Sequence, residues 1–561
     1  MPGPANIADR LRESARLDPD QIAVACPNGR DAFGKVVYAE QTFAELDAES
    51  DRLAVGLAAL GVRPGTRLVL AVPPGLEFIA LTFAIFRSGA VAVLVDPGMG
   101  RSNIFRCLQT VEPDGFVAVP AVQAVRALNC FRFPQAKLNV TVNGRRWFWG
   151  GATYASLQQH AAGSYSPVEI QGTDPAAIIF TSGSTGPPKG VVYEHAMFDA
   201  QVDLLRDYYS IQPGEVDLPG FPLFALFNAA MRVTTIIPDM NPAKPAQVDP
   251  ARILEAIRDR NVTQAFGSPA IWNRIGRHCE QTGETLSSLR RVLSAGAPVP
   301  VHVIRRIRAA FEHADADIFT PYGATESLPV ASNSGRIILE ETAARSAAGE
   351  GTCVGSLFPQ VRLRIIRIEA GPIKTLTQTQ ELPPGETGEI LVQAPVTTRE
   401  YFLRPDATAL AKISDPDGGF WHRMGDVGWL DEQQRLWFCG RKAHIVETAA
   451  GRMFTIPCES IFNEHPQISR SALVGTGTAP NQQPVLIAEP ESGAWPDTAA
   501  DRQSLRAELF LLGQASPLTR SLKTILFHRS LPVDIRHNVK IFREKLSPWA
   551  EEQLRLNAAD K

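Results

Sequence analysis

The feature that most constrains this chain of 561 residues is the segment 181–190, which reads Thr-Ser-Gly-Ser-Thr-Gly-Pro-Pro-Lys-Gly. It directly follows the apolar run 176–180, and a second apolar run, 191–193, comes straight after it. Glycines let backbone N–H groups approach an anion, hydroxyls add donors, and a lysine brings compensating positive charge. The segment therefore predicts a polyphosphate-binding loop at the end of a buried strand, in preference to a flexible Ser/Gly linker.

The commonest phosphate loop, G-x-x-x-x-G-K-[ST], does not fit this segment. Counted from Gly183, the sixth position is Pro188, and Lys189 is followed by Gly190 instead of a hydroxyl residue. Two consecutive prolines also lack an N–H and disfavour the opening of a helix at this point. The loop therefore indicates a different class of ATP-binding protein.

The composition is that of a globular chain long enough for a large domain and at least one smaller one, with 44% hydrophobic and 20% charged residues. The 56 Lys and Arg nearly balance the 59 Asp and Glu, so no broad basic surface for nucleic acid is expected. The seven cysteines show no C-x-x-C spacing, which argues against a disulfide framework and a zinc site. A small-molecule phosphate is the expected ligand.

The N-terminal segment lacks the basic stretch and apolar core of an export signal, which predicts a cytoplasmic protein. The most apolar stretch, 76–95, is interrupted by Glu77 and Arg87 and is too short between charges to span a bilayer. We therefore expect no integral membrane segment.

Helix-like and strand-like stretches alternate along the N-terminal third of the chain. They predict a helix over 42–60, a strand over 67–72, a helix over 77–87 and a strand over 90–95. This order is typical of a doubly wound α/β sheet. Further strands are expected at 176–180, 263–266, 291–294 and 318–319. Ligands of such sheets gather at the carboxyl ends of the strands.

The pattern changes near residue 361 to strands without long helices between them, which predicts a β-rich subdomain. A further break near residue 440 precedes about 120 residues of α+β pattern, the size of a small domain. We therefore expect a large N-terminal α/β domain over 1–440 and a small α+β domain over 441–561. A surface loop is expected over 332–351.

One expected strand end offers several groups that suit a nucleotide. Tyr322, Gly323, Thr325 and Glu326 follow the strand at 318–319. They supply an aromatic plane, a glycine for close approach, a hydroxyl and a carboxylate, so a base, a phosphate and a magnesium ion could each find a partner.

Two other segments add to this pattern. Gly296, Ala297 and Pro298 follow the strand at 291–294, where small residues let a flat base approach the backbone. Asp426 lies in an expected loop and can accept hydrogen bonds from both ribose hydroxyls. Such short motifs are singly no more than turns in most chains, so their ordered occurrence after the loop at 181–190 is the informative observation.

With these motifs in this order, the chain resembles the acyl-adenylate-forming superfamily of acyl-CoA ligases, luciferases and nonribosomal adenylation domains. The resemblance extends from residues 42–46 to residues 532–546. It implies that ATP, with Mg²⁺, activates a carboxylic acid as an acyl-adenylate. It also implies that the domain over 1–440 binds ATP and the acyl group, and that the domain over 441–561 moves on a hinge.

The resemblance implies a role for each motif residue. The β- and γ-phosphates would be held by Thr181, Ser182, Gly183, Ser184, Thr185, Gly186 and Lys189. The adenosine would be held by Gly296, Ala297, Pro298, Tyr322, Gly323, Asp426 and Arg441, the last two at the ribose. Thr325 would contact the α-phosphate, Glu326 would bind magnesium, and Lys540 would bridge the carboxylate and the α-phosphate during adenylation.

The hinge departs from the pattern of acyl-CoA ligases. Ala443 stands where those enzymes usually have an aspartate, and Glu447 stands where a CoA-handling lysine is usual. A carboxylate near the CoA phosphates would repel them. The sequence therefore predicts that the adenylate is not passed to CoA.

Within the superfamily, the chain most resembles the β-lactone synthetases of bacterial long-chain olefin biosynthesis. The resemblance rests on the loop at 180–189, on Arg536-His537-Asn538 before Lys540, and on the altered hinge. It implies adenylation of a long-chain 2-alkyl-3-hydroxy fatty acid, whose own hydroxyl then closes a β-lactone and releases AMP, after pyrophosphate has left. Other enzymes of an olefin-forming pathway are the implied partners.

Two alternatives remain open at this stage. A long-chain fatty acyl-CoA or acyl-AMP ligase would be distinguished by whether CoA is consumed. A non-catalytic ATP sensor or assembly scaffold would be expected to have lost Glu326 or Lys540, and the chain retains both.

Overall fold

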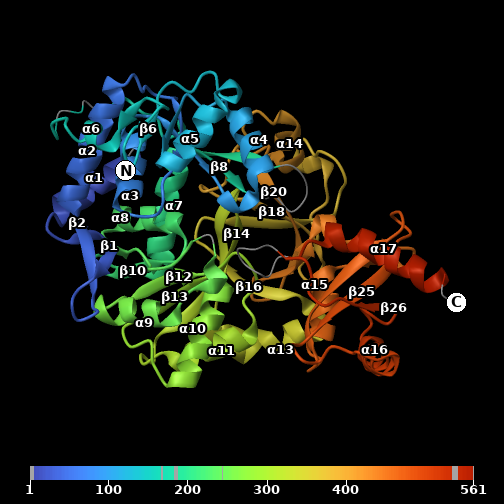
Figure 1. Ribbon diagram of the computed structural model, residues 1–561. Helices are drawn as coiled ribbons and strands as arrows, with labels where there is room; N and C mark the ends of the chain where they lie inside the picture. The colour runs from blue at the N-terminus through green and yellow to red at the C-terminus, as the bar shows by residue number, and fades with distance from the viewer. Residues whose placement is uncertain are drawn as a thin grey trace.

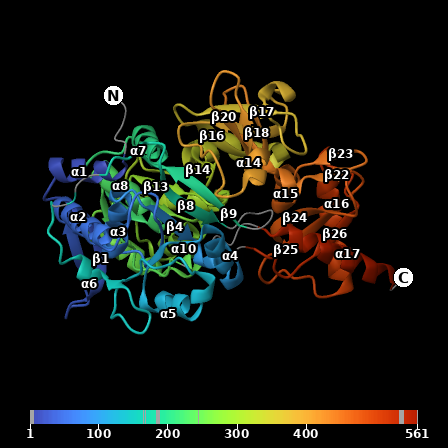
Figure 2. The same ribbon diagram turned by 90° about the horizontal axis from the view of Figure 1, so that it is seen from above.

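The computed structural model describes residues 6–163, 165, 168–181, 188–242, 244–533 and 541–559. In Figure 1 the N-terminal and central elements form a large α/β body, and the elements after β21 form a smaller group at one side. Figure 2 shows the same division from above, with β24–β26 and α17 lying away from α1–α3. The expected fold class, a large α/β domain with a small C-terminal domain, is confirmed. The boundary at residue 440 stays a prediction.

The first sheet carries the strand that precedes the predicted phosphate loop. Among the described residues it has seven strands in the order β7-β6-β5-β3-β4-β8-β9, parallel except for the last pair. In this order the strands are Ala152–Thr153, Val140–Thr141, Gly115–Ala118, Arg67–Ala71, Val91–Val95, Pro175–Thr181 and Lys189–Glu194. Thr181 lies opposite Lys189, so the predicted loop joins two antiparallel neighbours instead of opening a helix.

The second sheet runs in the order β17-β18-β20-β21-β16-β15-β14-β13-β12-β10-β11-β1-β2, with β19 beside β20. Its parallel part comprises β14 Asp317–Ala324, β13 Arg291–Ser294, β12 Gln264–Gly267, β10 Val216–Pro219, β11 Thr234–Ile236 and β1 Ile22–Arg30. Its antiparallel part comprises β2 Val36–Thr42, β15 Ser327–Ser334, β16 Thr352–Leu357, β17 Arg362–Ile366, β18 Gly388–Gln393, β19 Lys412–Ser414, β20 Phe420–Leu430 and β21 Leu436–Arg441. The expected β-rich subdomain is thus continuous with this sheet through β15 and β16.

Helices cover both sheets. The longer ones are α1 Ala8–Leu17, α2 Phe43–Ala59, α3 Leu76–Arg87, α4 Arg101–Val111, α5 Pro120–Leu128, α7 His195–Tyr209, α8 Ala225–Met231, α9 Pro250–Asp259, α10 Pro269–Thr282, α11 Val301–Ala310 and α14 Pro405–Ala411. α2 begins where the sequence predicts it. The Thr42 side chain accepts a hydrogen bond from the Glu45 N–H, and the Glu45 carboxylate accepts one from the Thr42 N–H.

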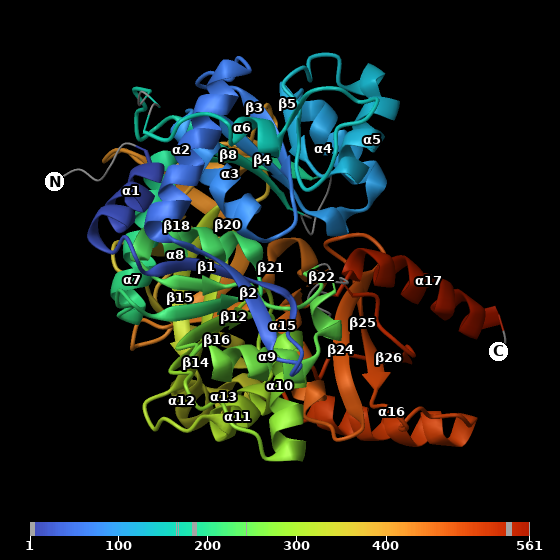
Figure 3. The same cartoon turned by 60° about the vertical axis from the view of Figure 1, so that its left-hand side comes forward.

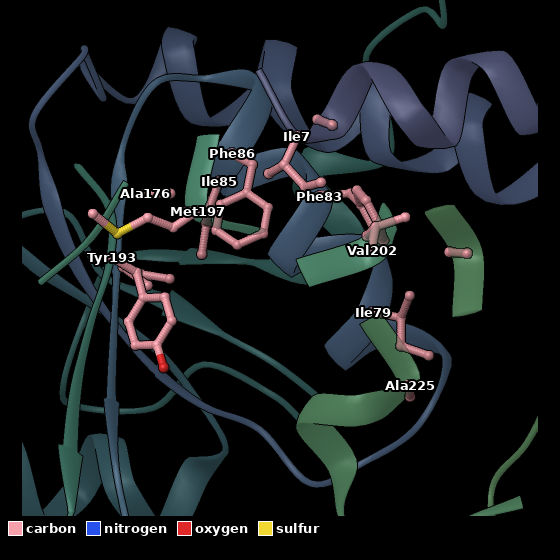
Figure 4. Close-up of a cluster of buried hydrophobic side chains, with 14 of the residues drawn as sticks. Ile7, Ile79, Phe83, Ile85, Phe86, Ala176, Tyr193, Met197, Val202 and Ala225 are labelled. Atoms are coloured by element: carbon pink, nitrogen blue, oxygen red, sulfur yellow. The ribbon is translucent and has the colours of Figure 1, made fainter. Parts of the chain in front are cut away.

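One continuous hydrophobic cluster joins the two sheets through α3 and α7. In Figure 4 the side chains of Ile7, Phe83, Phe86 and Val202 lie near one another, and the Tyr193 hydroxyl points away from this group. Phe83 and Phe86 come from α3, and Val202 comes from α7. The helices between the sheets therefore provide an apolar wall beside the strand ends.

The C-terminal domain is built on the three-stranded sheet β24 Ile468–Thr476, β25 Gln483–Pro490 and β26 Thr524–Phe527. Successive strand residues face opposite sides, so Leu473 packs with α16 Ala499–Gln514 while Val474 packs with α17 Arg543–Ala559. Figure 3 shows these two helices on either side of the strands. α15 Thr455–Asn463 and the hairpin β22 Val446–Thr448 with β23 Gly451–Met453 complete the domain.

Two sequence expectations were wrong. Asp426 lies within β20, not in a loop, because β20 pairs with β18 on one side and β21 on the other. The expected loop over 332–351 is largely helical, with α12 Gly335–Ile337 and α13 Ala343–Arg345 in it, because Ser334 caps the first turn. No helix in the described ranges is long and apolar enough to cross a membrane.

Candidate active site

A cavity of about 1600 Å³ lies at the carboxyl ends of the strands and receives residues from both sheets. Of the predicted site residues that are described, six line it: Lys189, Gly296, Gly323, Thr325, Glu326 and Arg441. They come from four separate parts of the chain. The structure thus brings together the segments that the sequence singled out one by one.

Glu326 is held by three hydrogen bonds. The Tyr401 hydroxyl donates to its Oε1 at 2.6 Å, and the Thr398 N–H and hydroxyl donate to its backbone carbonyl at 2.9 and 3.1 Å. The carboxylate therefore has a defined place on the cavity wall. A single carboxylate is compatible with the predicted magnesium role, because Mg²⁺ usually completes its shell with phosphate oxygens and water. The described residues contain no cluster of three or more His, Cys, Asp or Glu placed to hold a metal ion.

Thr325 and Lys189 lie close to Glu326. The Tyr193 hydroxyl donates to the carbonyl of Thr325. The Lys189 ammonium lies 4.8 Å from the centre of the Tyr401 ring, so the same tyrosine contacts the cation and the carboxylate. Burial raises the pKa of both tyrosines well above the usual value, so both hydroxyls stay protonated donors.

Asp426 and Arg441 form a second cluster. They lie opposite each other on β20 and β21, and an oxygen of Asp426 lies 2.9 Å from Nη1 of Arg441. The Tyr322 hydroxyl donates to the other carboxylate oxygen at 2.6 Å. Burial raises the pKa of Asp426, and Arg441 and Tyr322 oppose that shift. The nearby Asp426 in turn raises the pKa of Arg441. The two residues therefore form a buried ion pair whose members stabilise each other's charge.

The predicted adenine segments lie at neighbouring strand ends. Gly296 lines the cavity with φ of +93°, a conformation that favours glycine. Gly323 also lines the cavity, and a Cβ there would come within 2.8 Å of the Ser327 carbonyl oxygen. Ala297, Pro298, Tyr322 and Asp426 are not among the described residues that line the cavity. Ala297, Tyr322 and Asp426 stand directly next to residues that do, and Pro298 is two positions after Gly296.

Several predicted residues cannot be placed. Ser182, Gly183, Ser184, Thr185, Gly186 and Lys540 lie outside the described residues. The backbone of Thr181 ends β8 opposite Lys189, and its side chain is outside the described part. At the hinge, Ala443 lines the cavity, whereas Glu447 lies on β22 with a carboxylate oxygen 3.3 Å from Arg452 Nε.

The sequence does not predict two residues of the site, Lys412 and His422. Lys412 and His422 are partners across β19 and β20, and His422 lines the cavity. Burial lowers the pKa of Lys412 to about 7, against the attraction of the Glu326 carboxylate, and Lys412 Nζ donates to the Thr398 carbonyl. Burial also lowers the pKa of His422 well below its usual value. Neither residue belongs to a local motif, so only the strand pairing reveals them.

The cavity continues into an apolar pocket between the second sheet and the helices. Strand alternation and register place Phe266 beside Leu293, and α7 contributes Phe198 and Val202 from the other side. This part of the cavity is lined largely by apolar side chains, which suits an apolar ligand.

Two residues before Phe266 along the same strands, the pocket is closed by a group of polar side chains, here called the polar floor: Asp217, Gln264 and Asn228. Asp217 and Gln264 are register partners, and Oδ2 of Asp217 accepts a hydrogen bond from Asn228 at 2.7 Å. All three line the cavity and are almost fully buried. Burial raises the pKa of Asp217 to about 7. The pocket therefore ends on a carboxyl group that is far easier to protonate than an exposed one.

Comparison with known proteins agrees with this geometry. Residues 11–402 match the family described as AMP-binding enzyme, and the chain belongs to that family. It is 47% identical over 555 residues to the olefin beta-lactone synthetase of Xanthomonas campestris pv. campestris, covering 98% of each chain. It is also 47% identical over 565 residues to the olefin beta-lactone synthetase of Stenotrophomonas maltophilia, covering all of both chains.

A solved structure gives the same fold at lower identity. The amide bond synthetase McbA from Marinactinospora thermotolerans superposes with a TM-score of 0.77 at 23% identity, over 97% of this chain and 99% of McbA. This likeness extends to the C-terminal domain. It therefore supports the two-domain fold and carries no statement about substrate.

Proposed function

We propose that the chain uses ATP to adenylate a long-chain 2-alkyl-3-hydroxy fatty acid and then closes a β-lactone, with release of pyrophosphate and AMP. The observation that carries the proposal is the 47% identity, over nearly the whole chain, to two olefin beta-lactone synthetases. The proposal is also supported by the cavity, in which Glu326, Thr325 and Lys189 are continuous with the apolar pocket. One cavity can therefore hold a triphosphate and a long acyl chain together.

In the first step the substrate carboxylate attacks the α-phosphorus, and the bond to pyrophosphate breaks. Two anions must approach each other, so the site needs positive charge where negative charge builds up. Lys189 at the β9 end and Lys540 are the residues proposed to supply it. Glu326 is proposed to hold Mg²⁺, which would neutralise phosphate oxygens when bound. Thr325 is proposed to contact the α-phosphate.

The nucleotide would be held by the second cluster and by the glycine segments. Asp426, with Arg441 beside it, is proposed to accept hydrogen bonds from the ribose hydroxyls. Gly296, Ala297, Pro298, Tyr322 and Gly323 are proposed to surround adenine. Thr181, Ser182, Gly183, Ser184, Thr185 and Gly186 are proposed to donate to the β- and γ-phosphates.

In the second step the substrate's 3-hydroxyl oxygen bonds to the acyl carbon, the bond from that carbon to the AMP phosphate oxygen breaks, AMP leaves with the electron pair, and the hydroxyl proton passes to water. Because nucleophile and acyl carbon share one molecule, the reaction gains a large effective concentration that offsets ring strain. No thiol is needed. Ala443 at the proposed hinge after residue 440 fits a C-terminal domain that does not deliver CoA.

Product analysis tests the proposal. The protein is incubated with a 2-alkyl-3-hydroxy acid, ATP and Mg²⁺, with and without CoA, and the products are identified by NMR. We expect the β-lactone, AMP and pyrophosphate in equal amounts in both reactions. The matched acid without the 3-hydroxyl should stop at the bound acyl-adenylate. Acyl-CoA formation without lactone would favour a fatty acyl-CoA ligase instead.

The cellular location and the partner enzymes are proposed from the same resemblance. We infer a cytoplasmic enzyme whose partners are other enzymes of an olefin-forming pathway, since its substrate must be supplied and its lactone consumed. Mixing with extracts in which those enzymes are present or deleted, followed by co-purification, would test such an association.

A further inference from the structure

Ser268 occupies an unusual position at the mouth of the apolar pocket. It follows β12 and is the N-cap residue of α10, a position where serine normally accepts a hydrogen bond from the first turn of the helix. Here the side chain makes no capping bond. Its Oγ has no hydrogen-bond partner among the described residues, although only 8% of the residue is exposed. A buried hydroxyl without a partner is rare in native structures, and because Ser268 lines the cavity, a change of its χ1 rotamer would turn Oγ toward a ligand there.

The hydroxyl belongs to a residue that lines the cavity. Every second residue of an extended chain faces the same side. The cavity is lined in this way by Gln264, Phe266 and Ser268. The register of β12 and β13 pairs Gly267 with Ser294. The next residues along the two chains, Ser268 and Ala295, therefore stand side by side, and these two residues line the cavity. Ser268 therefore stands in the row next to Gly296, above the apolar row of Phe266.

This row is where the reacting end of the substrate must lie. The acyl carbon has to reach Thr325 and the adenylate segment at Gly296, while the alkyl chains occupy the apolar row below. A 3-hydroxyl is three bonds from the acyl carbon, so it stays in the same row as the acyl carbon. The polar floor at Asp217 is three to four residues deeper, about 10–13 Å along the strands, which is too far for that hydroxyl.

We propose that Ser268 binds the 3-hydroxyl of the β-hydroxy acid and is a positioning and specificity residue for ring closure. This inference rests on the proposed function. The serine hydroxyl can accept and donate hydrogen bonds at the same time. Oγ can therefore accept a hydrogen bond from the substrate's 3-hydroxyl, which leaves the lone pairs of the substrate oxygen free to face the acyl carbon. An acid without the 3-hydroxyl leaves Oγ unpaired and is bound less well.

The test compares S268A with wild type on two acids, the 2-alkyl-3-hydroxy acid and its 3-deoxy analogue. Adenylation of both acids is followed by ATP–pyrophosphate exchange, and lactone formation by NMR. We expect S268A to lower kcat/KM for lactone formation about tenfold, the effect of one neutral hydrogen bond. Exchange with the 3-deoxy acid should be unchanged. S268T, which keeps a hydroxyl, should recover part of the loss.

Ser294 provides the matched control. It ends the neighbouring strand, its Oγ is also buried without a partner among the described residues, and it is absent from the cavity lining. S294A should leave the preference for the hydroxy acid over the deoxy acid as in wild type. Thermal unfolding of all variants checks that each one folds.

The outcomes separate the two proposals. If wild type makes no lactone, the proposed function and the role of Ser268 both fail. If wild type makes lactone and S268A keeps the full preference for the hydroxy acid, only the role of Ser268 fails. An equal loss with both acids in S268A would also overturn it, because a merely structural defect acts on both.

Discussion

The Tyr401 hydroxyl lies 2.6 Å from Oε1 of Glu326, while the Lys189 ammonium lies 4.8 Å from the centre of the same ring. One tyrosine thus orients the proposed metal ligand and contacts the proposed phosphate cation. Because burial raises the pKa of Tyr401, it remains a hydrogen-bond donor across the working pH range. The carboxylate of Glu326 is therefore oriented before any metal arrives.

Glu326→Gln should raise the Mg²⁺ concentration needed for half-maximal pyrophosphate release at least about tenfold and lower turnover. The amide keeps the shape of the side chain and removes the charge that Mg²⁺ prefers. Pyrophosphate release is measured across a magnesium titration. Tyr401→Phe should cause a smaller shift in the same direction, because it removes only the orienting hydrogen bond. A Glu326→Gln variant that titrates like wild type, or that aggregates, would make Glu326 structural.

Asp426→Asn should raise the KM for ATP about tenfold or more. The change removes the charge that pairs with Arg441 at 2.9 Å and one strong acceptor for the ribose hydroxyls. The control is Asp431→Asn. Asp431 is also buried and pairs with Arg435 at 2.8 Å, but its partner Arg435 is outside the cavity lining, whereas Arg441, the partner of Asp426, lines the cavity. That variant should lose stability and keep its KM for ATP. An equal rise in both variants would argue against a nucleotide role for Asp426.

Local sequence patterns were sufficient for the elements and motifs that depend on neighbouring residues. The prediction of a helix over 42–60 agrees with α2 to within one residue at each end, since the cap is Thr42 and the chain turns at Gly61 with φ of +98°. The sequence predicts the place of Gly296 and Thr325 in the cavity because the strand ends of an α/β sheet converge on one edge. No local pattern predicts Tyr401, Lys412 or Asp217, because each acts through a partner more than ten residues away. Asp426 was expected in a loop because pairing on both sides of β20 leaves no local signal.

Lys540→Ala should lower pyrophosphate release at least about a hundredfold while ATP still binds. Lys540 lies outside the described residues, and the expectation rests on the charge that must meet two anions in the transition state. Release is measured in single turnover and ATP binding by calorimetry. Lys523→Ala, an exposed lysine of the same domain, is the control and should behave like wild type. Release from Lys540→Ala within a few-fold of wild type would exclude the assignment.

Asp217→Asn should change how stability depends on pH. In the folded protein burial raises the pKa of Asp217 to about 7, against the hydrogen bond from Asn228, whereas in the unfolded chain the carboxyl titrates near its usual 3.8. Between about pH 4 and 7 the folded state therefore holds the extra proton, and the free energy of unfolding falls as pH rises. Asp217 thus costs stability near pH 7, on the order of 4 kcal/mol at most.

We therefore expect the asparagine variant to gain stability relative to wild type as pH rises from 4 to 7, measured as the difference in Tm at each pH. The amide oxygen that replaces the carboxylate can still accept the Asn228 hydrogen bond, so packing is preserved. Asp431→Asn is again the control. Burial acts to raise the pKa of Asp431, but hydrogen bonds from Trp437 and Arg435 outweigh it and lower that pKa, so the charge is already present in both states above about pH 4. A Tm difference for Asp217→Asn that stays flat across this range would show that Asp217 is ionised in the folded protein.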